Sequence, residues 1–115
     1  MAEDSKPIYL RLRETIAASI LDGEFHDGDL LPSVRAFAAQ QGANPLTVAK
    51  AYQSFQDDGL VIVKRGIGMF VAPGATRRLR DHERARFMET VWPPVAAQMQ
   101  RLGIGLDELT ERLEA

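Results

Sequence analysis

The chain has 115 residues, which is enough for one compact core and a small appendage but not for two large domains. It contains no cysteine, which excludes disulfides, thiolate zinc sites and thiol nucleophiles. Its formal net charge of -2 lacks the overall basicity typical of nucleic-acid-binding domains, so any such role must depend on where single cations lie. No apolar run approaches the length of a membrane span, and the acidic segment Met1–Lys6 is unlike a secretory signal. We therefore expect a cytoplasmic protein without a membrane partner.

The first predicted elements are two amphipathic helices. After Pro7, apolar residues recur at every fourth position, namely Ile8, Leu12, Ile16 and Ile20. This spacing predicts a helix that ends at Gly23. A turn follows, and Ser33 is then a natural N-cap for a second, short helix that Gly42 ends in a left-handed conformation.

A third helix begins almost at once, because Asn44 is another N-cap and Pro45 suits the first helical position. Its apolar residues share one face, which consists of Val48, Ala51, Tyr52 and Phe55. We therefore expect these two aromatic side chains to pack in the core rather than to stack on nucleic-acid bases. The opposite face carries Leu46, Thr47, Lys50 and Gln53.

Two runs of β-forming residues follow the third helix, at 60–64 and 69–71, and Arg65–Gly68 between them has the composition of a hairpin turn. Two short helices joined by a tight glycine turn and followed by a hairpin predict a winged helix-turn-helix. The fold class expected is thus mainly α with a small β-hairpin wing. The third helix has the apolar inner face and small polar outer face that a helix in the DNA major groove requires.

These motifs together resemble the DNA-binding domain of GntR regulators. The residues that carry the resemblance are Pro7-Ile8-Tyr9, Gly23-Glu24-Phe25, Leu31-Pro32-Ser33-Val34-Arg35, Asn44-Pro45 with Thr47-Val48, and Gly66-Ile67-Gly68 with Phe70-Val71. The short helical remainder resembles the YtrA subfamily of that family. The resemblance implies a winged helix-turn-helix DNA-binding domain over residues 1–75 and a helical dimerisation region over residues 76–115.

The same resemblance implies that the third helix enters the major groove and that the wing approaches the minor groove. The DNA contacts that it implies are Ser33, Arg35, Asn44, Leu46, Thr47, Lys50, Arg65 and Gly66. The chemistry suits these roles, because Arg35 can bond guanine or phosphate in bidentate fashion and Arg65 can enter a narrow minor groove. Leu46 stands where many family members have a polar residue, and it suits a thymine methyl group.

The tail is predicted to be helical from Arg77 until Pro93-Pro94 break or kink the helix, with further helices to Leu102 and from Leu106. Its apolar residues exceed what short helices can bury alone: Leu79, Phe87, Val91, Trp92, Val95, Met99, Leu102, Leu106, Leu109 and Leu113. We therefore predict a homodimer interface and, with it, an inverted-repeat operator. The cluster Arg77–Arg80 is expected to be a solvated helix face paired with nearby acids.

The interpretation is a sequence-specific, double-stranded DNA-binding transcription regulator without a cofactor or metal. The family resemblance implies repression, and the YtrA resemblance implies a transporter operon; whether a small-molecule effector binds stays open. The alternative is a winged-helix protein-interaction module without DNA binding, against which Arg35, Thr47 and Arg65 argue together. His26 and His82 have no third ligand at metal-site spacing. The sequence shows no paired catalytic carboxylates, nucleophile elbow or phosphate-cradling loop, so we do not expect an enzyme.

Overall fold

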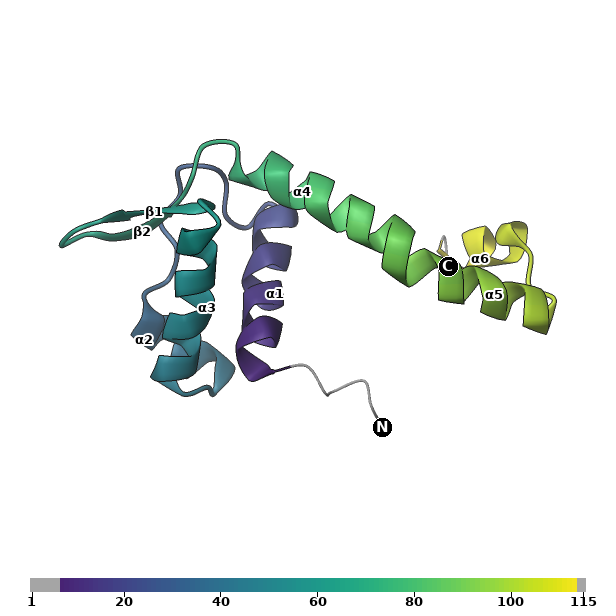
Figure 1. Cartoon of the computed structure of the whole chain (residues 1–115), viewed down its shortest axis with the longest axis horizontal. Helices are drawn as coiled ribbons and strands as arrows, with labels where there is room; N and C mark the ends of the chain where they lie inside the picture. The colour runs from purple at the N-terminus through teal and green to yellow at the C-terminus, as the bar shows by residue number, and fades with distance from the viewer. Residues whose placement is uncertain (1–6, 114–115) are drawn as a thin grey trace. The chain divides into compact units, whose positions relative to one another are not determined.

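The computed structural model describes residues 7–113 (Figure 1), so the expectation for Met1–Lys6 lies outside the described residues. The chain divides after Arg80 into two compact units. The first unit contains three helices and a two-stranded sheet, and the second is helical. No helix within residues 7–113 is long and apolar enough to cross a membrane.

The helices of the first unit are those that the spacing and cap residues predict. They are α1 (Ile8–Leu21), α2 (Val34–Gln41) and α3 (Pro45–Asp57). The Ser33 side chain accepts a hydrogen bond from the Ala36 N–H at 3.1 Å, which caps α2. Gly42 ends α2 with a φ of 62°, a left-handed conformation that glycine adopts without steric cost. The fold class predicted from the sequence is confirmed.

The wing consists of β1 (Val61–Lys64) and β2 (Gly68–Val71), which pair antiparallel so that Val61 lies opposite Val71. The edge of β2 that faces away from β1 pairs with the segment before α2, since the Leu31 N–H donates to the Met69 carbonyl at 2.9 Å. Gly68 has a φ of 147°, a backbone conformation that residues with a Cβ rarely adopt, so glycine is favoured here. The segment before α2 therefore anchors the wing on the helices.

The core of the first unit lies between α1, α2, α3 and the wing. Its most buried large side chains are Phe55, Ile20, Val48 and Val71. Tyr52 is also buried, at 3% exposure, and thus packs in the core as predicted. Leu79, expected to contribute to a dimer interface, is only 4% exposed and belongs to this core instead. Because Ala75 and Leu79 pack on the first unit, the observed division falls at Arg80 rather than at residue 75.

Tyr52 joins the core to the start of α2, because its hydroxyl donates to the Pro32 carbonyl at 2.6 Å. A Tyr52→Phe variant is expected to lose about 1 kcal/mol of unfolding free energy, since that carbonyl loses its donor. Burial raises the pKa of Tyr52 from 10.0 to about 12. The protonated Tyr52 side chain thus stabilises the folded state below pH 10, and this contribution is lost as the pH rises through about 12. Denaturant unfolding across alkaline pH checks this; an identical alkaline loss in Tyr52→Phe and wild type would contradict it.

The C-terminal part of the chain is formed by consecutive helical segments. They are α4 (Ala75–Arg86), the π-helix η2 (Phe87–Val91), α5 (Trp92–Leu102) and α6 (Leu106–Leu113). The two prolines, expected to break or kink a helix, occupy the first turn of α5, and the backbone stays helical through Trp92 at φ -66° and ψ -44°. The π-helical turn directly before them is the irregularity that accommodates the missing donors.

Candidate DNA interface

The predicted DNA contacts lie on three neighbouring elements of the first unit. Ser33 and Arg35 are at the start of α2, four residues are at the start of α3 (Asn44, Leu46, Thr47 and Lys50), and Arg65 and Gly66 are in the wing turn. Seven of the eight are exposed, and Thr47 is half-buried. Ser33 and the wing residues Val63 and Ile67 line one groove, so the structure brings the start of α2 and the wing together.

Two of these residues also serve as helix caps. Asn44 Oδ1 accepts from the Leu46 N–H at 2.8 Å, as Ser33 Oγ does from Ala36 in α2. Their acceptor atoms are therefore used by their own helices, which leaves the Asn44 amide group and the Ser33 hydroxyl as donors. Donors at a helix N-terminus, where the helix dipole is positive, suit phosphate oxygens.

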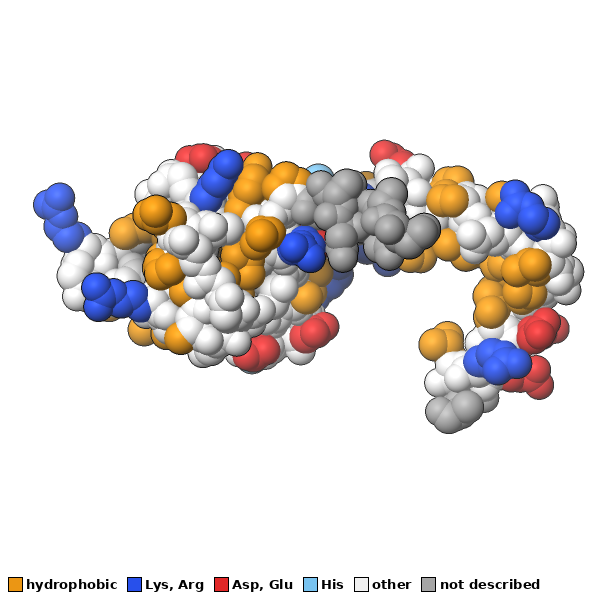
Figure 2. Space-filling view, turned by 90° about the horizontal axis from the view of Figure 1, so that it is seen from below, with side chains coloured by type: hydrophobic (Ala, Val, Ile, Leu, Met, Phe, Trp, Pro, Cys, Tyr) orange, Lys and Arg blue, Asp and Glu red, His pale blue; other side chains and the backbone are white. Residues whose placement is uncertain are grey.

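The arginines at the interface are free to bind a partner. Within residues 7–113, Arg35 and Arg65 form no hydrogen bond or ion pair. A purely structural salt bridge, the alternative role for Arg35, is therefore absent from the described part of the chain. Figure 2 shows Lys and Arg side chains at the wing end of this unit, with hydrophobic side chains next to them.

The lysines of the interface rest on aromatic rings. Lys50 Nζ lies 4.2 Å from the centre of the Tyr9 ring in α1, and Lys64 Nζ lies 4.8 Å from that of Phe70. A cation above a ring is attracted by its quadrupole, which orients the side chain. The contact between Tyr9 and Lys50 does not follow from local sequence pattern, because only the packing of α1 on α3 brings these two residues together. Lys64, beside the wing turn, was not among the predicted DNA contacts.

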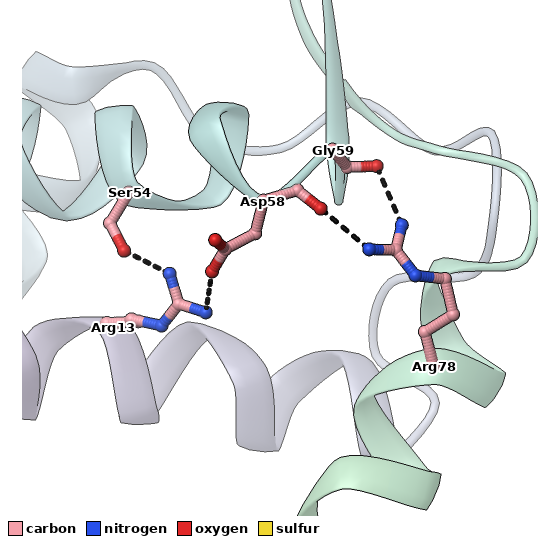
Figure 3. A network of polar contacts seen from close by, with 5 residues as sticks. All are labelled: Arg13, Ser54, Asp58, Gly59 and Arg78. Atoms are coloured by element: carbon pink, nitrogen blue, oxygen red, sulfur yellow. Dashed lines mark hydrogen bonds and ion pairs between the residues drawn. The ribbon is translucent and has the colours of Figure 1, made fainter.

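The C-terminal end of α3 is held by two arginines (Figure 3). Arg13 of α1 donates to the Ser54 hydroxyl and to the Asp58 carboxylate, the latter at 2.6 Å. Arg78 of α4 donates to the carbonyls of Asp58 at 2.7 Å and Gly59 at 3.1 Å. Arg78 is exposed, as predicted, but its guanidinium binds carbonyls left unpaired at the end of α3 and not the nearby acids that the sequence suggested.

Asp27 holds the start of α4 from the turn before α2. Its carboxylate accepts from the Gly74 N–H at 2.8 Å, the Thr76 N–H at 3.2 Å and the Thr76 hydroxyl at 2.6 Å. Chiefly the Thr76 hydroxyl, and also the Gly74 N–H, lower the pKa of Asp27 below its ordinary value of 3.8. Asp27 therefore acts as a cap for a helix almost fifty residues further along the chain.

An Asp27→Asn variant is expected to be less stable than wild type at neutral pH, because an amide offers these three donors only one acceptor atom. Since folding lowers this pKa, the stabilisation is present above about pH 4 and is lost as the pH falls through the folded-state pKa. Thermal unfolding between neutral and acidic pH measures the effect. The control is Glu24→Gln, a neutralised carboxylate on the same loop, and an equal loss in both variants would contradict the assignment.

The apolar residues predicted for dimerisation lie on the helical unit, where Figure 2 shows hydrophobic side chains at the surface. Five of them are exposed, namely Phe87, Val95, Leu102, Leu106 and Leu113. Four are half-buried, namely Val91, Trp92, Met99 and Leu109. None of the described residues of η2, α5 and α6 is fully buried, so these helices do not enclose a core by themselves.

The two histidines carry no metal site in the described part of the chain. His26 Nδ1 lies 3.5 Å from the Asp29 carboxylate, and both side chains are largely exposed. Within residues 7–113 no group of three or more His, Asp and Glu side chains is arranged to hold a metal ion.

A helix-turn-helix followed by a two-stranded wing, with free arginines on both parts, defines the class of winged helix-turn-helix DNA-binding proteins. Residues 8–71 match the family described as bacterial regulatory proteins, gntR family. The chain belongs to the GntR family of transcription regulators, whose members are not enzymes.

Similar proteins extend the match over the rest of the chain. The HTH-type regulator YhcF of Bacillus subtilis is 33% identical over 97% of this chain and 91% of its own. The repressor YtrA of the same organism is 31% identical over 93% and 82%. A GntR family regulator from Listeria monocytogenes has a similar structure, with a TM-score of 0.71, 26% identity and coverage of 97% and 96%. The DNA-binding domain of AraR, solved in complex with operator ORR3, has a TM-score of 0.55 and 29% identity over 57% of this chain and 80% of its own.

Proposed function

We propose that the protein binds an inverted-repeat DNA operator as a homodimer and represses the genes that follow it. The observation that carries the proposal is the exposed set of predicted contacts at the starts of α2 and α3 and on the wing, where Arg35 and Arg65 have no partner within residues 7–113. The similar domain of AraR was solved on an operator, and the similar full-length YtrA is named a repressor. Repression follows physically if the occupied operator overlaps a promoter.

The homodimer is supported by the apolar surface of the helical unit. Leu102, Leu106 and Leu113 are 66% to 86% exposed, which is unfavourable for apolar side chains in water. A two-fold dimer through this surface would present two α3 helices to one duplex and so require two half-sites about one DNA turn, or a multiple, apart. Doubling the phosphate contacts would also raise the affinity of a domain that carries few cations.

Selection of bound duplexes from a random DNA pool at moderate salt tests the proposal, with Arg35→Ala in parallel. The expected result is an enriched inverted repeat that is lost with the variant. Binding to the selected duplex should weaken steeply with salt, because each neutralised phosphate releases counterions. A folded dimer that enriches no sequence would instead support the protein-interaction alternative.

The similarity to YtrA also supports a proposal for the genes controlled, namely a transporter operon or the protein's own operon. The protein would act on them in the bacterial cytoplasm. A genome search with the selected operator tests it, because the motif is then expected upstream of such genes. Any small-molecule effector is expected at the dimer interface, since about forty residues of helix are too few to enclose a typical ligand pocket.

A further inference from the structure

The turn of the wing presents an isoleucine side chain to solvent. Ile67 is 66% exposed, and among the large apolar side chains described in the first unit only that of Leu46 is more exposed. The Ile67 N–H donates to the Lys64 carbonyl at 2.9 Å and closes a four-residue turn. Gly66, the third residue of this turn, has the φ of 80° that a type II turn requires. Ile67 is therefore held by the backbone at the end of the wing, two residues from Arg65.

The wing has two faces, and Ile67 lies on the one turned toward α2. Together with Val63 and Met69 it lines the groove that reaches Ser33, the first predicted DNA contact of the chain. Ile62 lies on the other face, because it is paired with Phe70, whose ring carries the Lys64 ammonium group. The wing thus carries two exposed isoleucines, of which only Ile67 faces the predicted contacts.

The two kinds of base pair differ in the minor groove by one donor. An A·T pair presents only acceptors there, whereas a G·C pair adds the 2-amino group of guanine. An isoleucine side chain accepts no hydrogen bond, so covering that amino group would leave a desolvated donor unpaired, which is costly. A·T-rich sequences also have a narrower minor groove with a more negative potential, which favours the neighbouring Arg65.

We propose that Ile67 determines base specificity in the minor groove and makes the protein prefer A·T over G·C pairs where the wing meets the operator. The inference rests on the proposed function, because it requires an operator that the wing contacts. Arg65 contributes affinity that depends on salt and on the width of the groove. Ile67 contributes the discrimination against the 2-amino group, because a side chain without hydrogen-bonding atoms leaves that donor unpaired.

Operator duplexes with base analogues test the proposal on the unmodified protein. Hydroxyl-radical footprinting first locates the minor-groove positions protected beside each half-site, and these positions then carry A·T, G·C, inosine·C or diaminopurine·T pairs. Inosine lacks the 2-amino group of guanine, and diaminopurine adds it to adenine, while the major groove keeps its pattern. G·C and diaminopurine·T are expected to bind about tenfold more weakly than A·T, the scale of one unfavourable base pair. Inosine·C is expected to bind like A·T.

Two matched variants then assign the preference to one side chain. Ile67→Asn supplies an amide oxygen that can accept from the guanine amino group, so the difference between G·C and inosine·C should shrink. Ile62→Asn, the same change on the opposite face of the wing, should keep it. Equal binding of G·C and inosine·C by wild type, or an unchanged preference in a folded Ile67→Asn variant, would overturn the proposal. If wild type selected no operator at all, the proposed function itself would fail, and this inference with it.

Discussion

A Val95→Glu variant is expected to be monomeric and to bind the full operator about 10²- to 10⁴-fold more weakly than wild type, the range by which linking two binding events raises affinity. Val95 lies on α5 and is 38% exposed, so a charge there can be tolerated in the monomer but not in an apolar interface. The first unit should stay folded, because its core consists of residues up to Leu79. Sedimentation equilibrium measures the association, and titration of full-site and half-site duplexes measures the affinity.

The control for this variant is Ala97→Glu, which adds the same charge two residues further along α5 at an exposed position. Two residues correspond to about 200° around a helix, so the two glutamates lie on nearly opposite faces. Ala97→Glu is expected to remain dimeric, and both variants should bind a single half-site as wild type does. A Val95→Glu protein that stays dimeric at the same concentrations as wild type would show that α5 does not form the interface.

Replacing Arg35 with alanine is expected to cost about 1 to 3 kcal/mol at each half-site, the value of a good arginine contact with DNA. A dimer carries the residue twice, so the loss on a full operator should be about double. Little loss of folding stability is expected, because Arg35 is exposed and has no partner within residues 7–113. Fluorescence anisotropy with the selected duplex, combined with thermal unfolding, separates the two quantities.

The salt dependence of binding identifies the role of this arginine. If Arg35 contacts phosphate, its removal should reduce the slope of affinity against salt by about one counterion per subunit; if it contacts a base, preference at one operator position should relax instead. Arg84→Ala, which removes the same charge from exposed α4, is the control. An equal loss of affinity in both variants would attribute the effect to net charge and remove Arg35 from the contact set.

Most of the fold could be predicted because its signals are local. Ser33 and Asn44 cap the helices that directly follow them, and Gly42 ends α2, as their side-chain chemistry requires. The spacing of Val48, Tyr52 and Phe55 placed one face of α3 in the core. The candidate contacts, by contrast, came from a family resemblance, and the structure adds that two of them cap helices and that Lys50 rests on Tyr9.

The prolines of the tail show how far local reasoning reaches. Pro93 and Pro94 predict a break or kink before a further helix to Leu102, and they stand in the first turn of α5, which ends at Leu102 and directly follows a π-helical turn. The backbone before them is helical, so their missing N–H groups fall where π-helical bonding changes to α-helical bonding and not at a free helix start. The sequence thus predicts an irregular backbone near the prolines, but it does not predict that the irregularity is a π-helical turn before them.

By itself, the sequence determined the order of helices and strands, the face of α3 that is buried and the turn of the wing, because each depends on residues within a few positions of one another. Only the tertiary structure decided what holds these elements together. Arg78 binds carbonyls 19 and 20 residues before it, and Asp27 caps a helix through Thr76, 49 residues after it. No local pattern marks such pairs, because an exposed aspartate or arginine has the same sequence signature whether or not packing brings it a partner.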